Sequence, residues 1–186
     1  MLRERLGPAI PARVDADALY RAVNSVQRSL IRVDADETTY NLHIILRFEL
    51  ELALIEGTLA VEDLPAAWDE GMQRLLGVEV PDAAQGVLQD VHWGAGLFGY
   101  FPTYTLGNLI AAQLWTRLQP DLPEIEAQLG RGEFAPLREW LREHIHRHGR
   151  KFPPRELLMR VTGDTLRPEP FLDYLRAKLA DAGAIQ

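Results

Sequence analysis

Cysteine is absent from this chain of 186 residues, which excludes disulfide bonds, thiolate metal sites and cysteine nucleophiles. The absence is also consistent with a reducing compartment, and we expect the protein to be cytoplasmic. Basic residues are scarce as well: 20 Lys and Arg stand against 27 Asp and Glu, for a net charge of −7. Because nucleic-acid binding requires a concentrated basic face, we expect no nucleic-acid partner.

Long hydrophobic runs are also missing. The most apolar stretch, residues 42–55, is interrupted by three charged residues, Arg47, Glu49 and Glu51. A helix that crosses a bilayer needs about 20 predominantly apolar residues, so no membrane association is expected. The first 17 residues contain no apolar stretch of the length found in signal peptides.

Alternating patterns typical of strands are rare, whereas helix signals recur along the chain. Gly57 and Gly77 can end helices, and capping aspartates stand at Asp15, at Asp34 or Asp36, and at Asp63. These signals predict helices at residues 15–27, 36–56, 63–76, 102–119, 123–129, 134–148 and 168–182, with a further short one beginning at 153.

The fold class predicted from this pattern is all-α. Residues 1–14 contain Gly7, Pro8 and Pro11 and are expected to form an irregular lead-in. Residues 15–186 are expected to form a single, irregular multi-helix domain. The β-branched residues 29–33 suit a short strand, which leaves room for one short β-hairpin.

The helix expected at residues 36–56 is apolar on most of its circumference, which is typical of a helix in the middle of a structure. Arg47 and Glu51 are four residues apart and share a face, so we expect them to form an ion pair near the core. A lone histidine on such a helix, here His43, is expected to be a hydrogen-bonded core residue.

Three histidines lie close together near the C-terminal end of another predicted helix. His144 and His148 would share a helix face, as zinc ligands often do. Zinc peptidases usually carry H-E-x-x-H, in which the glutamate after the first histidine activates water, but Ile145 follows His144 here. We therefore interpret the cluster as surface cations that favour the helix C-terminus, with adventitious metal binding as the alternative. No metal ligands are predicted.

The segment from Gly86 to Tyr104 combines glycines, aromatic residues, an acid and a histidine. Asp90 could orient His92 and fix its tautomer, and Tyr100 could donate a hydrogen bond to a developing oxyanion, as could Tyr104. The alternative is a glycine-aromatic turn that fills the core. The pattern alone favours neither interpretation.

Arg32 stands among apolar residues. Its guanidinium could bind the terminal carboxylate of a substrate with two parallel hydrogen bonds. It could also pair with Asp34 or Asp36 simply to hold the turn, and the pattern alone favours this structural role.

Two motifs in these segments resemble signatures of the carboxypeptidase Taq family, Ile31-Arg32-x-x-Ala35-Asp36 and Gly86-x-x-Gln89-Asp90-x-His92-Trp93. These are helical zinc metallocarboxypeptidases that remove C-terminal amino acids. The similarity runs from about residue 15 to the C-terminal end and includes residues 39–49 and 99–108. It is a resemblance to the C-terminal part of the family, because the H-E-x-x-H motif and the third ligand lie upstream in full members. We therefore expect a truncated relative that has no cofactor of its own, whereas zinc belongs to the full-length family.

The resemblance also implies roles for individual residues. Arg32 is implied to hold the substrate's terminal carboxylate, with Asp90 and Trp93 on the same substrate-binding side. His92 is implied to steady the tetrahedral intermediate, with a tyrosine that is either Tyr100 or Tyr104, in a vestigial or assisting capacity.

Three functions follow from the resemblance. The chain could be a carboxypeptidase-related protein without activity by itself, a subunit that complements a separate zinc-binding chain, or a non-catalytic module that binds a peptide C-terminus. We also expect a homodimer that hides exposed apolar faces of the helices at residues 36–56 or 102–118.

Overall fold

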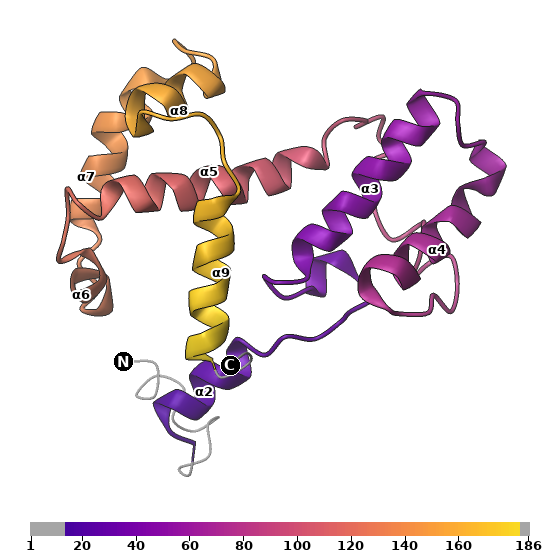
Figure 1. The fold of residues 1–186 in the computed structure, drawn as a ribbon, viewed down its shortest axis with the longest axis horizontal. Helices are drawn as coiled ribbons and strands as arrows, with labels where there is room; N and C mark the ends of the chain where they lie inside the picture. The colour runs from indigo at the N-terminus through magenta and orange to yellow at the C-terminus, as the bar shows by residue number, and fades with distance from the viewer. Residues whose placement is uncertain (1–13, 183–186) are drawn as a thin grey trace. The chain divides into compact units, whose positions relative to one another are not determined.

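The computed structural model describes residues 14–182, and every regular element in this range is a helix (Figure 1). The all-α prediction is therefore confirmed. The short strand expected at residues 29–33 is wrong, because the chain there leads into a 3-10 helix, η1, at Arg32–Asp34. The predicted lead-in, residues 1–14, lies outside the described residues except for Val14. None of the helices within residues 14–182 has the length and apolar character needed to cross a bilayer.

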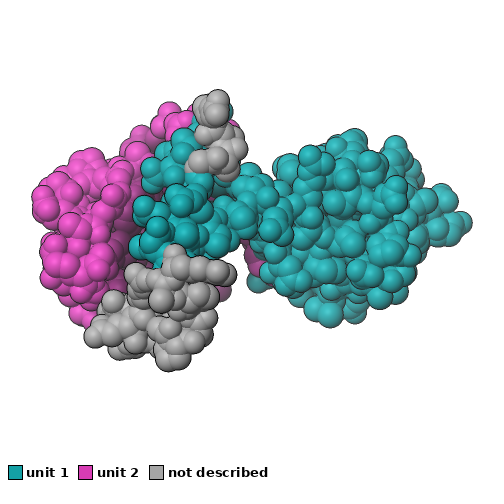
Figure 2. Space-filling model, turned by 90° about the horizontal axis from the view of Figure 1, so that it is seen from below, with its two compact units in different colours: residues 1–102, 175–186 teal, residues 103–174 magenta. Residues whose placement is uncertain are grey.

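The chain divides into two compact units (Figure 2). Unit 1 comprises residues 1–102 and 175–186, and unit 2 comprises residues 103–174. The chain passes between the units at the start of α5 (Pro102–Leu118) and within α9 (Glu169–Asp181). Neither of these two points lies in a linker that the sequence would reveal. The division into compact units does not test whether residues 15–186 form a single domain, which stays a prediction.

The described residues of unit 1 form α2 (Ala16–Val23), α3 (Tyr40–Ile55), α4 (Leu64–Leu76) and the last part of α9 (Glu169–Asp181), with a second 3-10 helix, η2, at Val61–Asp63. Asp15 caps α2 as predicted, since its carboxylate accepts a hydrogen bond from the Ala18 amide at 2.7 Å. The N-cap residue of α3 is Thr39, so the prediction of Asp34 or Asp36 as the cap is wrong; Asp36 instead accepts hydrogen bonds from the amides of Thr38 and Thr39 in the turn before the helix. Helix α2 is shorter than predicted, whereas α3 and α4 match their predicted ranges closely.

The core of unit 1 lies between α3 and α4. Five buried side chains form it, Leu46, Leu50, Trp68, Met72 and Leu76. The two helices approach closely at Gly71, where an added β-carbon would lie 2.2 Å from Cδ1 of Leu46. Gly77 then ends α4 in the left-handed conformation, at φ 65°, which a residue without a β-carbon adopts at little cost. The packing fixes the inner face of α3, which carries the site described below.

Unit 2 is built from α5 (Pro102–Leu118), α6 (Ile125–Gly130), α7 (Ala135–His144), the 3-10 helix η3 (His146–His148), α8 (Pro154–Thr162) and the first part of α9 (Glu169–Asp181). Its core gathers around Leu118, Ile125 and Trp140. The buried Gln113 joins α5 to the segment after α8, because its side-chain amide donates to the Thr165 carbonyl at 2.8 Å. The helix predicted at residues 134–148 is divided in the structure, because α7 ends at His144 and η3 begins at His146.

Candidate functional site

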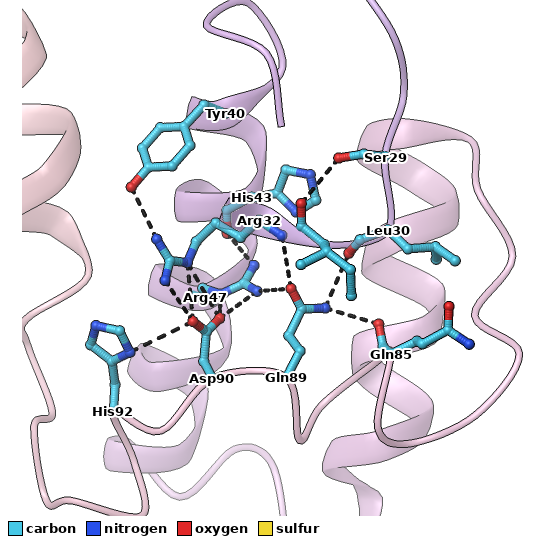
Figure 3. A network of polar contacts seen from close by, with 11 residues as sticks. Ser29, Leu30, Arg32, Tyr40, His43, Arg47, Gln85, Gln89, Asp90 and His92 are labelled. Atoms are coloured by element: carbon cyan, nitrogen blue, oxygen red, sulfur yellow. Dashed lines mark hydrogen bonds and ion pairs between the residues drawn. The ribbon is translucent and has the colours of Figure 1, made fainter. Parts of the chain in front are cut away.

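A partly buried carboxylate, Asp90, lies between two buried arginines in unit 1 (Figure 3). Arg32 donates to Oδ1 of Asp90 from Nη2 at 2.7 Å and from Nε at 3.1 Å. Arg47 donates from Nε to Oδ2 of the same carboxylate at 2.6 Å. We call Arg32, Arg47, Gln89 and Asp90 the arginine network. It brings residues far apart in the sequence to one point, and three of its members, Arg32, Gln89 and Asp90, belong to the two motifs singled out above.

Gln89 completes the network because both the oxygen and the nitrogen of its side-chain amide form hydrogen bonds. Its oxygen accepts from the Arg32 backbone amide and from Nη2 of Arg47, both at 2.9 Å. Its nitrogen donates to the carbonyls of Leu30 and Gln85 at 3.1 and 2.9 Å. A primary amide has two donors and one oxygen that accepts two bonds, so the full capacity of Gln89 is used. The segment before η1 is thereby fixed to the loop that follows α4.

Burial and charge act together on the ionisable groups of the arginine network. Arg47 is fully buried, and this desolvation lowers its pKa to about 10, although Asp90 opposes the shift. Burial alone would raise the pKa of Asp90, but hydrogen bonds and charge from Arg32 and Arg47 outweigh it and hold the pKa below its usual range. For Arg32, burial is likewise outweighed by Asp90 and Tyr40, which raise its pKa. All three groups are therefore charged near neutral pH.

Arg32 has its carboxylate partner in Asp90, not in Asp34 or Asp36 as the structural alternative expected. One edge of its guanidinium, Nε and Nη2, faces Asp90, while Nη1 donates to the hydroxyl of Tyr40 at 3.1 Å. The side chain is only 8% exposed. Its role as an anchor for a substrate carboxylate remains a prediction.

His92 packs against aromatic rings beside the arginine network. Its ring centroid lies 4.2 Å from that of Phe101 and 5.7 Å from that of Tyr100. Nδ1 of His92 is 3.7 Å from Oδ1 of Asp90, which is an ion-pair separation and too long for a hydrogen bond. Asp90 accepts its hydrogen bonds from the two arginines, and a role for Asp90 in orienting His92 stays a prediction.

The other predicted site residues lie at different depths. Tyr100 is 45% exposed beside His92, so its hydroxyl-bearing ring is accessible. Trp93 is half-buried, and its ring lies edge-on to Trp68 at 6.2 Å between centroids. Tyr104 stands in the first turns of α5, in unit 2. The structure thus brings Arg32, Asp90, His92, Trp93 and Tyr100 together in unit 1.

Glu51 holds the loop that carries these residues. It is buried on α3 and accepts from Nε1 of Trp93 at 2.8 Å and from the Gly99 amide at 3.1 Å. The predicted ion pair between Arg47 and Glu51 is wrong, because each pairs with the loop rather than with the other. One helix face therefore fixes the loop at two points, through Asp90 and through Trp93 and Gly99.

Arg47 and Phe101 are site residues that sequence reasoning missed. The guanidinium carbon of Arg47 lies 4.5 Å from the ring centroid of Trp68 and 5.4 Å from that of Phe101. Arg32 lies 5.9 Å from the same Phe101 ring. Cations over aromatic faces are attracted by the ring quadrupole, so Phe101 stabilises both charges. A charged residue on the inner face of an otherwise apolar helix was the available signal for Arg47.

The histidines do not form a donor set for zinc. Within residues 14–182 no group of three or more His, Asp or Glu side chains is placed to hold a metal ion. His144 ends α7, with Nδ1 bonded to the Trp140 carbonyl at 2.9 Å, while His148 lies in η3, so the shared helix face expected for them is wrong. His43 is buried as predicted, but neither ring nitrogen has a hydrogen-bond partner among the described residues. The residues present do not fit a zinc site.

Comparisons with known proteins agree with the family resemblance of the motifs that contain Arg32 and Asp90. The sequence profile of the carboxypeptidase Taq (M32) metallopeptidase family matches residues 1–179. The chain is 54% identical over 167 residues to thermostable carboxypeptidase 1 of Thermus thermophilus, which covers 90% of this chain and 33% of that protein. It is 45% identical over 168 residues to carboxypeptidase 1 of Bacillus subtilis, covering 90% and 34%.

Solved structures give the same result. The crystal structure of the M32 carboxypeptidase from Deinococcus radiodurans R1 matches with a TM-score of 0.90 and 45% identity, over 98% of this chain and 36% of that one. This chain spans about a third of the length of the curated relatives it matches. Family profile, sequence identity and fold agree, and the chain belongs to the carboxypeptidase Taq (M32) metallopeptidase family.

Proposed function

We propose that this chain forms the substrate-binding side of a zinc metallocarboxypeptidase and has no peptidase activity by itself. The arginine network carries the proposal, because it joins Arg32 of one family motif to Gln89 and Asp90 of the other, beside His92. Hydrolysis in such an enzyme requires a metal-bound water and a general base. The sequence has no H-E-x-x-H motif, and residues 14–182 present no cluster of metal donors. We therefore assign no metal to this chain.

In this proposal Arg32 holds the terminal carboxylate of a peptide. The edge of its guanidinium that contains Nε is committed to Asp90, so the peptide would bind at the Nη1 edge and take the place of the Tyr40 hydroxyl. Asp90 then acts as a positioning residue that fixes the orientation of Arg32. A guanidinium already held by a carboxylate loses little further side-chain freedom when it binds a second anion.

The remaining residues assist from the same loop. His92 and the exposed Tyr100 lie next to each other and would steady the tetrahedral intermediate, with Tyr104 as the other tyrosine that could do so. Trp93 contributes by holding the loop in place through its bond to Glu51. These groups bind and stabilise, and none of them replaces a metal-activated water.

The anchor role is tested by titrating the purified chain with a short peptide and with its C-terminal amide. We expect the free acid to bind at least about tenfold more tightly, because the amide lacks the charge that a guanidinium recognises. Equal affinities would contradict a role for Arg32 as a carboxylate anchor. The peptidase claim is tested separately: zinc-dependent release of C-terminal residues by the purified chain would contradict it.

The outer face of α3 favours a partner that completes the enzyme. Four large apolar side chains on this face are 39 to 71% exposed and spaced by three, four and three residues, Ile45, Phe48, Leu52 and Ile55. This 3-4 spacing is that of a seam which packs against one other helix. The exposed Glu49, which pairs with Arg74 at the surface, and Glu56 follow two of these residues. A second copy of α3 would bring these acidic groups together, so a helix with basic residues beside its apolar stripe fits better.

We therefore propose a complementing, zinc-binding chain rather than a homodimer as the occupant of this seam. Co-expression with the part of the Thermus thermophilus relative upstream of its matched third provides a defined probe. We expect a stable complex with zinc-dependent carboxypeptidase activity, which Arg32→Gln abolishes without releasing the subunit. Substituting Phe48→Ser should instead weaken assembly. Sedimentation of this chain alone as a homodimer, with no complex formed, would contradict the proposal.

A further inference from the structure

A second polar site lies in unit 2, which contains none of the residues of the two family motifs. It is a hollow of about 460 Å³ lined by Arg117, Glu143, His144, Arg147, His148, Phe152, Arg160 and Val161. Three guanidinium groups and two imidazoles thus face one space with a single carboxylate. Residues 144–160 hold five Lys and Arg and one Glu, in a chain whose net charge is −7. The local charge is opposite in sign to that of the whole protein.

The local fold explains why these cations converge. Arg117 and Arg160 stand in the last turns of α5 and α8, and His144 is the last residue of α7. Cations at helix C-termini complement the helix dipole, which accounts for each residue singly. Trp115, Leu141 and Val161 pack these three helices around a shared core, so that their ends meet. The dipole alone does not require the three ends to face one hollow.

Each of the three arginines pairs with one carboxylate at the protein surface. Arg117 pairs through Nη1 with Asp121, and Arg160 pairs through Nε and Nη2 with Glu156, neither of which lines the hollow. Arg147 pairs through Nη1 with Glu143. These pairs are 35 to 63% exposed and therefore weak, so an anion can share or replace them. Planar guanidinium forks suit ligands that present several oxygens.

We propose that this hollow binds a small phosphate-bearing anion. The multiple oxygens of such a ligand match three guanidinium groups, and the volume exceeds what a single phosphate needs. Phe152 lines the same space, with the Arg160 guanidinium carbon 4.1 Å from its ring centroid. The ring gives the hollow an aromatic wall, which favours a ligand that carries a planar group next to its phosphates. The proposal is independent of the arginine network and of any peptidase activity.

Calorimetric titration with inorganic pyrophosphate and with ADP tests the site. We expect saturable binding of one ligand per chain, and at least about tenfold weaker binding in Arg147→Gln/Arg160→Gln, because two charged donors are lost. Tighter binding of ADP than of pyrophosphate would assign the ligand to the nucleotides, and equal binding would assign it to inorganic phosphates. Both results support the site.

Two further variants keep the test independent of folding. Glu143→Gln removes the carboxylate that competes for Arg147, and we expect it to tighten binding severalfold. Arg138→Gln is the matched control: Arg138 is an exposed arginine of α7 that pairs with Glu139 and does not line the hollow, so binding should not change. Absence of saturable binding, an unchanged affinity in the double variant, or an equal loss in the control would overturn the proposal.

Discussion

His43 should make unit 1 sensitive to mild acid. Its side chain is fully buried, and burial, followed by the charges of Arg47 and Arg32, lowers its pKa from 6.5 to about 4. The folded-state pKa lies below that of the unfolded chain, so the unfolded chain takes up the proton first. Stability is therefore complete above the unfolded value of 6.5 and falls as the pH decreases from there toward about 4.

The size of the effect follows from these two values. Each unit of pKa difference corresponds to about 1.4 kcal/mol, so lowering the pH from about 7 to about 5 should cost about 2 kcal/mol of unfolding free energy through His43 alone. His43→Leu fills a similar volume without a titrating group and should lose this component. Urea unfolding at both pH values, followed by tryptophan fluorescence, measures it, since Trp68 and Trp93 report on unit 1.

The control for this experiment is His146→Gln. His146 is an exposed histidine in η3, and its replacement should leave the full pH-dependent loss in place. Asp90 does not confuse the comparison, because its lowered pKa keeps it ionised through this range. If His43→Leu shows the same loss between the two pH values as the unsubstituted chain, then the buried imidazole is not the cause and the reasoning is refuted.

Three other substitutions probe the contacts of α3. Asp90→Asn leaves two buried arginines without their carboxylate and should lower the unfolding free energy by about 3 to 5 kcal/mol, measured by urea titration, and a loss under about 1 kcal/mol would contradict this. Glu51→Ala removes the acceptor for the Gly99 amide, so hydrogen exchange at that amide should accelerate, whereas unchanged protection would show that another group holds the loop. Gly71→Ala forces Leu46 to move in a packed core and should cost about 1 to 3 kcal/mol in thermal unfolding, and no loss would mean that the core adjusts freely.

Helix ends were the part of the fold that local sequence could predict. Gly57 and Gly77 both adopt positive φ, at 70° and 65°, and end α3 and α4 where glycine was expected to do so. Pro102 begins α5 for an equally local reason. The strand expected at residues 29–33 failed because the β-branched Ile31 and Val33 suit any extended backbone. Bonds to a distant loop hold this segment instead, since the Arg32 amide donates to Gln89 and the Leu30 carbonyl accepts from it.

Pairing across long stretches of sequence could not be predicted in the same way. The motifs brought Arg32, Asp90 and His92 into consideration, and all three do meet in unit 1. Arg47 was assigned to Glu51 because the two share a helix face, yet its true partner is 43 residues away in the sequence. Side-chain spacing on a helix identifies neighbours on that helix, whereas a charge on its buried face can be matched by any loop that packs there.

The two faces of α3 differ in a way that bears on the proposal that this chain is one side of an enzyme. The hydrogen bonds that join Arg32, Arg47, Gln89 and Asp90 to one another all form between residues 32 and 90 of this chain, so these bonds need no other chain. The outer face, in contrast, leaves Ile45, Phe48, Leu52 and Ile55 exposed. Assembly through that face would bury apolar surface while the inner face is already formed, so binding would not have to compensate for ordering the site. A complementing chain should accordingly raise the thermal stability of unit 1 without changing the hydrogen-exchange protection of the Arg32 amide.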